Sequence, residues 1–426
     1  MIVEPHLSSH FYALRGSKHS VAVLDIGSNK IGCFIAEPDA HGQMQIIGIG
    51  HHHAKGLRGG IVTDSKEAQA SIAHAVNAAE KMAGGTLDHV IANVSFSDLA
   101  SHNVHVELPI AHGEVTDQSI ATILRTACRE LAQPHRQVVH CMVTQYQLDG
   151  AKGIRDPRHM YGMLLKADVH VLTVDERRLM NLMHLVSRCH LDVVDWVITP
   201  YAAGLGCLET DEQELGVTVI DMGASTTSVA IFQGGCNIFS AIVPVGGKHV
   251  TNDVAKGLST SLQHAERLKT LYGSVLDSEQ DEHMMVDVMP LGDEDSVEYA
   301  QVPRAQLVRI IRPRIEEIFE LVRDHVQKQG VASMMGRTIV LTGGASQLVG
   351  VRELATTMFA KQVRMGKPKL FPGLAESVSS PNFSVPIGML YYATQHSFED
   401  DLLRKPAQGD VSFGMERLVR WFKERF

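Results

Sequence analysis

Two short segments, one in each half of the chain, share a pattern that restricts the fold. "VAVLDIGSNKIGCFIAE" (Val21 to Glu37) and "GVTVIDMGASTTSVAIFQGG" (Gly216 to Gly235) each read as an apolar strand, a D-x-G turn and a second apolar strand. Asp25 and Asp221 lie about 200 residues apart, too far for a solenoid repeat. Either segment alone would be an ordinary hairpin with an Asp-Gly turn. The matching pair predicts a duplicated domain, once in each half.

The two turns have the composition of a phosphate clamp. Glycine lets the backbone approach a bulky anion and point N–H groups at it, and hydroxyl side chains add donors. The carboxylates would repel phosphate directly, so we expect Asp25 and Asp221 to hold Mg²⁺ through its water molecules. The candidate phosphate contacts in the turns are Gly27, Ser28, Asn29, Lys30, Gly223, Ser225, Thr226 and Thr227.

A third segment, "RTIVLTGGASQLVGVRELA" (Arg337 to Ala355), predicts a strand, a Gly-Gly joint and a helix. Such a joint lets a flat ring lie against the backbone beside a helix N-terminus. The three segments in this order resemble the actin, Hsp70 and sugar-kinase superfamily. The resemblance implies an α/β, actin-like fold with two duplicated ribonuclease-H-like domains flanking a cleft for ATP and Mg²⁺. It adds as nucleotide contacts Gly246, Gly247, Gly343, Gly344 and Ala345.

The segment "HAERLK" (His264 to Lys269) offers a further contact with the base of the nucleotide. Glu266 and Lys269 are three residues apart and therefore share one face of the predicted helix. A surface ion pair explains the same spacing equally well, so both interpretations stay open.

A segment between the two D-x-G turns resembles the inserted subdomain of the FtsA family of bacterial cell-division proteins. Its pattern Q-Y-x-L-D-G-x-x-G-I-x-D-P runs from Gln145 to Pro157, and "GLRGGIV" precedes it at Gly56 to Val62. Within it, residues 115–132 predict a helix capped by Thr116 or Asp117. The resemblance extends from about Ser20 to His396 and includes the terminal helix.

The resemblance implies a division of the chain into subdomains. We expect an actin-like first half (subdomain 1A) at 18–95, 181–205 and 376–396, and an inserted, SHS2-like subdomain (1C) at 96–180. We expect the second half (2A) at 206–250 and 323–375, a smaller subdomain (2B) at 251–322, a linker at 397–411 and an amphipathic helix at 412–426.

The terminal segment "SFGMERLVRWFKERF" predicts an amphipathic helix with a basic polar face. A polar linker with Pro and Gly precedes it, which argues against a core helix, while a partner-binding helix remains an alternative. Apolar residues, a bordering Trp and basic residues are what a helix lying on an anionic membrane needs. The candidate membrane contacts are Met415, Arg417, Leu418, Val419, Arg420, Trp421, Phe422, Lys423 and Phe426.

Composition restricts the location and the partners. The net charge of −9 argues against a general nucleic-acid binder. The sequence shows no run of eighteen apolar residues and no secretory signal at its start, and its six cysteines are dispersed without a C-x-x-C pair. We therefore expect a cytoplasmic protein whose membrane contact is peripheral.

The resemblance to FtsA implies specific partners. Members of that family polymerise, tether filaments of the tubulin relative FtsZ to the inner face of the cytoplasmic membrane at the septum, and signal to later division proteins such as FtsN. The C-terminal tail of FtsZ binds the smaller subdomain of the second half. In this chain "VPRAQLVRIIRPRIEEIFELV" (Val302 to Val322) matches that region, with a basic surface expected from Arg304, Arg312 and Arg314; a solvated helix face is the alternative.

Two departures from the superfamily pattern concern hydrolysis. Thr199 aligns with the Glu or Gln that positions the attacking water in Hsp70 and actin, and a hydroxyl orients water less strongly than a carboxylate. Ala224 and Ser225 stand near a position that is usually Gly, and the Cβ of Ser225 narrows the approach of phosphate. Asp25, Asp221 and Thr199 are therefore the catalytic candidates of a protein with at most weak ATPase activity, in which ATP mainly closes the cleft and favours the polymer.

Rival interpretations explain less of the sequence. A superfamily phosphotransferase needs a catalytic carboxylate near the acceptor, for which no motif is found. A PilM-like pilus-assembly protein shares the inserted subdomain but lacks a basic amphipathic tail, and an Hsp70-like chaperone needs a substrate domain. The run His51 to His53 invites a metal-site interpretation, yet three adjacent imidazoles cannot all face one ion.

Overall fold

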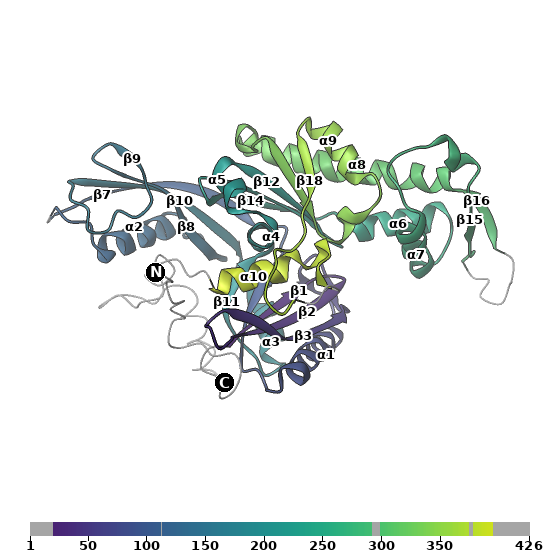
Figure 1. Ribbon diagram of the computed structural model, residues 1–426, viewed down its shortest axis with the longest axis horizontal. Helices are drawn as coiled ribbons and strands as arrows, with labels where there is room; N and C mark the ends of the chain where they lie inside the picture. The colour runs from purple at the N-terminus through teal and green to yellow at the C-terminus, as the bar shows by residue number, and fades with distance from the viewer. Residues whose placement is uncertain (1–19, 112, 292–298, 375–377, 395–426) are drawn as a thin grey trace.

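Two five-stranded sheets form the centre of the protein, seen in a computed structural model that describes residues 20–111, 113–291, 299–374 and 378–394 (Figure 1). Their strands are β1 (Val21–Ile26), β2 (Lys30–Pro38), β3 (Met44–His53), β6 (His89–Val94), β11 (Asp192–Ile198), β12 (Val217–Met222), β13 (Thr227–Gln233), β14 (Cys236–Val243), β17 (Thr338–Thr342) and β18 (Gln362–Met365). The first-half sheet has the order β11-β6-β1-β2-β3 and the second-half sheet β18-β17-β12-β13-β14.

The pairing directions repeat as well. In each sheet the three strands of the hairpin run are antiparallel, and the two strands on the other side pair in parallel. The duplicated α/β domain predicted from the two D-x-G hairpins is therefore confirmed. Every residue of β1 and of β12 is buried, as expected for central strands covered on both faces.

Two apolar helices lie between the sheets. α4 (Thr199–Cys207) leads from the first-half sheet toward the second, and α10 (Ser384–Thr394) packs against it. Both share one hydrophobic core with the facing sides of both sheets. Their backbones are so close that a Cβ at Gly388 would lie 1.7 Å from the carbonyl oxygen of Ala202, so glycine is required there. The outer faces are covered by α1 (Ser65–Ala83) and α3 (Glu176–Ser187) on one side, and by α8 (Arg304–Lys328) and α9 (Val351–Phe359) on the other.

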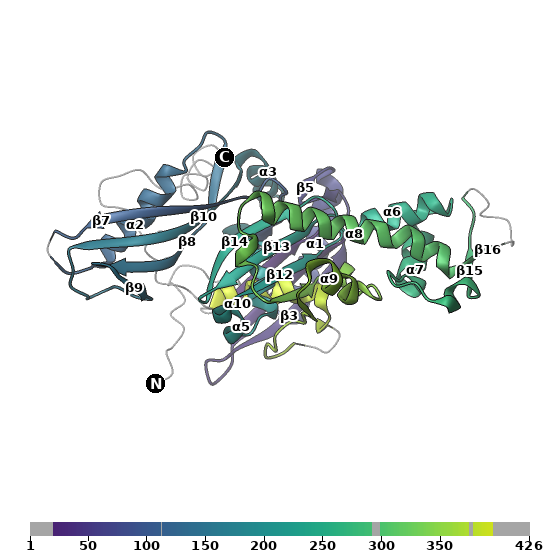
Figure 2. The same ribbon diagram turned by 90° about the horizontal axis from the view of Figure 1, so that it is seen from above.

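A third sheet extends from one end of the molecule (Figures 1 and 2). It is antiparallel with the order β7-β10-β8-β9, and its strands are β7 (Ala100–Pro109), β8 (Arg136–Leu148), β9 (Ala151–Ile154) and β10 (Leu164–Asp175). The predicted helix covers one face as α2 (Asp117–Glu130), with Thr116 as its N-cap. We call this unit the inserted sheet.

A buried polar contact joins the inserted sheet to the edge strand of the second-half sheet. His170 on β10 is fully buried, and its Nδ1 lies 2.9 Å from the carbonyl oxygen of Asn237 on β14. Because a carbonyl only accepts, Nδ1 carries the proton, and Nε2 accepts from the hydroxyl of Ser101 at 2.7 Å. Burial lowers the pKa of His170 to about 3, which keeps the ring neutral.

A helical lobe lies at the opposite end of the molecule from the inserted sheet (Figure 1). It contains α6 (Gly247–Gly257), α7 (Leu262–Tyr272), the small sheet of β15 (Met285–Val288) and β16 (Ala300–Pro303), and the first half of α8. α8 buries one apolar stripe that includes Leu307, Ile311, Ile315 and Phe319. No helix in the ranges described here is long and apolar enough to cross a bilayer.

Shorter elements complete the structure. They are β4 (Leu57–Arg58), β5 (Ile61–Val62), α5 (Thr210–Leu215), η1 (Glu279–Glu282), η2 (Ala332–Met334), η3 (Gly344–Gln347) and η5 (Pro381–Phe383). The subdomain boundaries expected from the sequence stay predictions. The linker at 397–411 and the helix at 412–426 lie outside the described residues.

Candidate functional site

The two D-x-G turns have the same local structure. The N–H of Gly27 donates to the carbonyl oxygen of Lys30 at 3.1 Å, and the N–H of Gly223 donates to that of Thr226 at 2.9 Å. Each turn follows directly after a buried central strand that carries the Asp one residue before its end. The topology therefore presents two equivalent turns, with Asp25 and Asp221 buried beneath them.

Burial and charge shift the ionisation of both carboxylates. Burial raises the pKa of Asp25 to about 6, against the opposing influence of Lys30 and Asn93. Burial raises the pKa of Asp221 to about 7, the Asp25 carboxylate adds to the rise, and Ser228 opposes it. Two buried carboxylates that repel one another fit a divalent cation, which would stabilise both negative charges.

Such a cation would need further ligands from outside the protein. The part of the chain that the structure describes has no group of three or more His, Cys, Asp or Glu side chains able to hold a metal ion. Water molecules and phosphate oxygens would therefore complete the coordination, as is usual for Mg²⁺ beside a nucleotide.

Lys30 lies between the first turn and the segment before α10. Its ammonium donates to the carbonyl oxygen of Asn382 at 3.1 Å and stands 3.3 Å from the centre of the Phe383 ring. Burial lowers the pKa of Lys30 to about 8, while Asp25 opposes the shift. Lys30 thus carries a positive charge beside the turn at neutral pH, where it suits a phosphate contact.

Asn93, which sequence reasoning missed, connects Asp25 to Thr199. Its amide nitrogen lies 2.9 Å from Asp25 Oδ1 and 3.3 Å from Thr199 Oγ1, and its oxygen accepts from the N–H of Ile26 at 2.6 Å. The Thr199 hydroxyl donates to the carbonyl oxygen of Val94 at 3.0 Å. The only signal in the sequence was a lone Asn near the end of the apolar strand "HVIANV".

The Gly-Gly joint lies against the second turn. Gly343 adopts φ +85°, and a Cβ there would lie 2.2 Å from Asp221 Oδ1, so only glycine fits beside the carboxylate. The Gly343 N–H donates to the carbonyl oxygen of Pro381 at 3.2 Å, and Gly344 begins η3. The third motif is therefore held next to the second, as the superfamily resemblance implies.

The candidate base contacts gather at the start of α6. Lys269 lies 2.7 Å from Glu266 and 2.9 Å from the hydroxyl of Thr251, and its ammonium donates to the carbonyl oxygen of Gly247 at 3.3 Å. A Cβ at Gly247 would lie 3.0 Å from that of Ala345. Glu266 and Lys269 thus form an ion pair. This ion pair also lies beside the Gly246-Gly247 turn and the Gly-Gly joint.

Other candidates in the turns have different surroundings. Ser28 accepts from the N–H of Gly59 at 2.9 Å, Asn29 is exposed, and Ser225 is buried. Thr226 is half-buried in the second turn. The hydroxyl of Thr227 donates to the carbonyl oxygen of Val245 at 2.8 Å and the side chain is fully buried, so its expected phosphate contact stays a prediction.

The three histidines at 51–53 do not converge. The ring of His51 lies edge-on to Phe383, with centroids 6.4 Å apart, and His52 stacks on His74 at 4.7 Å. Because side chains alternate along β3, His52 lies on the opposite face from His51 and His53.

The arginines expected to form a basic surface are all ion-paired. Arg304 donates to the carbonyl oxygen of Tyr272 at 2.8 Å and pairs with the buried Asp281, so it supports the fold of the lobe. Arg314 pairs with Asp253 at 2.6 Å and with Glu317. Arg312, 42% exposed, pairs with Glu316 at 2.8 Å and Asp277 at 3.3 Å.

Comparison with known proteins identifies similar chains. The family model of the cell division protein FtsA matches residues 218–388, and that of the SHS2 domain inserted in FtsA matches residues 96–173. The cell division protein FtsA of Agrobacterium fabrum is 40% identical, over 98% of this chain and 99% of that protein.

Two solved structures share the fold. The PilM-PilN type IV pilus biogenesis complex matches with a TM-score of 0.64 and 15% identity, over 88% of this chain and 99% of that one. MreB5 of Spiroplasma citri bound to ADP matches with a TM-score of 0.54 and 14% identity, over 88% and 96%. At these identities the likeness concerns the fold, which is actin-like.

Proposed function

The chain belongs to the FtsA family of cell division proteins, and on that premise we propose that it is an ATP-binding, polymerising tether for FtsZ. It holds FtsZ filaments at the inner face of the cytoplasmic membrane during septum formation and recruits later division proteins such as FtsN. The role in cell division follows from the family. The observation that carries the nucleotide part is the pair of equivalent turns with Asp25 and Asp221 beneath them.

Each group at the site would make a different contact with a bound nucleotide and its Mg²⁺. Bound Mg²⁺ would neutralise phosphate charge. Asp25 and Asp221 would orient the water molecules around that ion, and Lys30 would approach a phosphate oxygen from the first turn. Gly343 and Gly344 would border the adenosine, with Lys269 and Glu266 on the other side. The ADP held by the actin-like MreB5 supports a nucleotide in this fold.

The same geometry favours binding over turnover. The Thr199 proton is directed at the Val94 carbonyl, and Asn93 donates to the Thr199 oxygen. The hydroxyl is therefore already engaged on both sides and is a poor group for orienting an attacking water. ATP then acts mainly as a ligand that closes the cleft and favours the polymer.

Membrane attachment is assigned to residues 412–426. A single short helix with one apolar face binds a membrane weakly and reversibly. Linked copies make later contacts intramolecular, which can raise the overall binding by a factor of about 10²–10⁴. Head-to-tail contacts between actin-like subunits would supply that linkage.

The helical lobe is the proposed site for the FtsZ tail. Arg312 is the best-placed cation because it is 42% exposed and its ion pairs lie at the surface, where they are worth little. Arg314 acts mainly by joining α8 to α6 through Asp253. A PilM-like function is less well supported, since the PilM-PilN match is 15% identical against 40% for the Agrobacterium protein.

Co-sedimentation with vesicles of anionic phospholipid tests this proposal. The full chain and a truncation after Asp410 are mixed with FtsZ, with and without ATP and Mg²⁺. We expect FtsZ to pellet only with the full chain, and more with ATP and Mg²⁺. A truncation that carries FtsZ to vesicles as well as the full chain would refute the membrane role of residues 412–426. An Arg312→Glu variant should still pellet with the vesicles but should no longer carry FtsZ into the pellet. Arg352→Glu on α9 is the matched control and should pellet with FtsZ as the parent does.

A further inference from the structure

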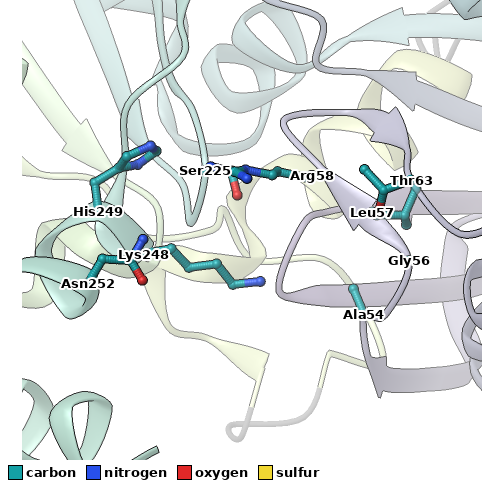
Figure 3. A pocket seen from close by; sticks show the side chains of 9 residues that line it. All are labelled: Ala54, Gly56, Leu57, Arg58, Thr63, Ser225, Lys248, His249 and Asn252. Carbon is teal, nitrogen blue, oxygen red and sulfur yellow. The ribbon is translucent and has the colours of Figure 1, made fainter. Parts of the chain in front are cut away.

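A pocket of about 360 Å³ opens between the two halves, beside both turns (Figure 3). One wall is the segment from Ala54 to Thr63, which carries the β4–β5 hairpin. The other wall is Ser225 of the second turn together with Lys248 and Asn252 of α6. Its lining includes two cationic side chains, Arg58 and Lys248, and no carboxylate. The pocket is therefore electrostatically suited to an anion.

Lys248 reaches across from one half of the protein to the other. Its ammonium donates to the backbone carbonyl of Ser28 in the first turn at 2.6 Å. Burial lowers the pKa of Lys248, and the charge of Arg58 adds to the effect while Glu266 opposes it. Arg58 and the half-buried Lys248 line the same pocket, and an anion placed between them would stabilise both positive charges.

The pocket is continuous with the phosphate turns. The N–H of Gly59 donates to the hydroxyl of Ser28 at 2.9 Å, so the hairpin that carries Arg58 is fixed to the first turn. A Cβ at Gly59 would lie 4.0 Å from the Thr226 methyl of the second turn. An anionic chain held between the turns would therefore extend its free end toward Arg58 and Lys248.

We propose that Lys248 and Arg58 receive the terminal phosphate of a nucleoside triphosphate and distinguish it from a diphosphate. Lys248 then exchanges the Ser28 carbonyl for a phosphate oxygen, which forms a stronger, charge-assisted hydrogen bond. Arg58, from the opposite wall, offers a planar fork to the same phosphate. Because the two side chains come from different halves, a bound triphosphate contacts both halves through its terminal phosphate. A diphosphate lacks that phosphate and does not make these contacts. This inference rests on the proposed nucleotide binding.

Calorimetric titration of the full chain tests it, with Mg²⁺ and either ADP or the non-hydrolysable β,γ-imido analogue of ATP. The variants are Lys248→Met and Arg58→Met, which keep most of the side-chain length. Lys55→Met is the matched control, because Lys55 is exposed on the same segment and does not line the pocket. We expect each pocket variant to weaken analogue binding by about 10- to 100-fold and ADP binding by less than about twofold. Lys55→Met should change neither.

The titrations distinguish a failure of nucleotide binding from a failure of the Lys248 and Arg58 contacts. If the parent chain binds neither nucleotide, the proposed nucleotide binding fails, and this inference fails with it. If the parent binds both and the pocket variants lose both equally, or lose neither, the inference is overturned while nucleotide binding stands. Thermal unfolding of each variant without nucleotide checks that the fold is intact. A general loss of stability would not change the ratio of the affinity for the ATP analogue to the affinity for ADP.

Discussion

The side-chain amide of Asn93 donates a hydrogen bond of 2.9 Å to the carboxylate of Asp25, from the neighbouring parallel strand. The same side chain accepts from the N–H of Ile26, which follows Asp25 in the chain. Asn93 therefore fixes both the carboxylate and the backbone at the entry of the first turn. This group belongs to β6, far from either D-x-G motif in sequence.

Replacing Asn93 by Ala should weaken binding of ATP with Mg²⁺ by about tenfold, because Asp25 loses a donor that favours its charged form. The free energy of unfolding should fall by about 1–3 kcal/mol, since the buried N–H of Ile26 is left without an acceptor. Calorimetric titration and chemical denaturation measure the two effects. Asn103→Ala, at an exposed position of β7, is the control, and equal affinities in all three proteins would contradict the assignment.

Asp221→Asn should stabilise the nucleotide-free protein in a pH-dependent way. The pKa of Asp221 is about 7 in the folded protein, against 3.8 as the ordinary value. Between those values the folded state binds more protons than the unfolded state, so this carboxyl makes the free energy of unfolding fall as pH rises. The variant lacks that decline. Its free energy of unfolding should therefore exceed that of the parent protein by about zero near pH 4 and by roughly 1–3 kcal/mol above pH 7.

Denaturation of both proteins in urea at several pH values measures that difference. Comparing variant with parent removes the contribution of His170, whose lowered pKa acts in the opposite direction. If the difference in free energy of unfolding between variant and parent shrinks as pH rises, the pKa of Asp221 is not raised in the folded protein.

Hydrolysis should depend little on Thr199. Because its hydroxyl is engaged by Val94 and Asn93, Thr199→Ala should change the single-turnover rate of ATP hydrolysis by no more than about twofold. Quenched-flow assay of bound, radiolabelled ATP gives the rate. Rapid turnover in the parent that collapses in the variant would instead make Thr199 a water-positioning group and would overturn the view of ATP as a mainly structural ligand.

His170→Leu should loosen the inserted sheet from β14. The substitution leaves the Asn237 carbonyl and the Ser101 hydroxyl without their buried partner, at a cost of about 1–3 kcal/mol. Hydrogen–deuterium exchange should then speed up in residues 236–243, which lead directly into the Gly246-Gly247 turn. His105→Leu, whose ring is exposed on the same sheet, should leave that exchange unchanged. Equal effects of both substitutions would count against a specific junction.

The parts of the fold that could be predicted are those with a local sequence signal. The two D-x-G turns, the Gly-Gly joint and the helix capped by Thr116 each occupy one continuous segment whose residue types dictate the backbone. The duplicated domain could be predicted because the two turns match, and the structure confirms it by repeating the strand order around them.

The parts that could not be predicted depend on contacts between distant segments. Asn93 reaches Asp25 only through the parallel pairing of β1 and β6, and Lys248 reaches Ser28 only when the halves come together. The direction of the Thr227 hydroxyl is set by Val245, and the partner of Arg304 is Asp281, which is buried in a neighbouring turn. Residue type alone does not tell which way such a side chain points.

We propose that the cleft above Asp25 and Asp221 binds ATP through Mg²⁺. Calorimetric titration of the full chain with ATP, with and without Mg²⁺, tests it most directly. One site per chain is expected, with binding at least about tenfold tighter, or about 1.4 kcal/mol, when Mg²⁺ is present, and with that increment lost in Asp221→Asn. Absence of binding, or an affinity that neither Mg²⁺ nor the substitution changes, would contradict it.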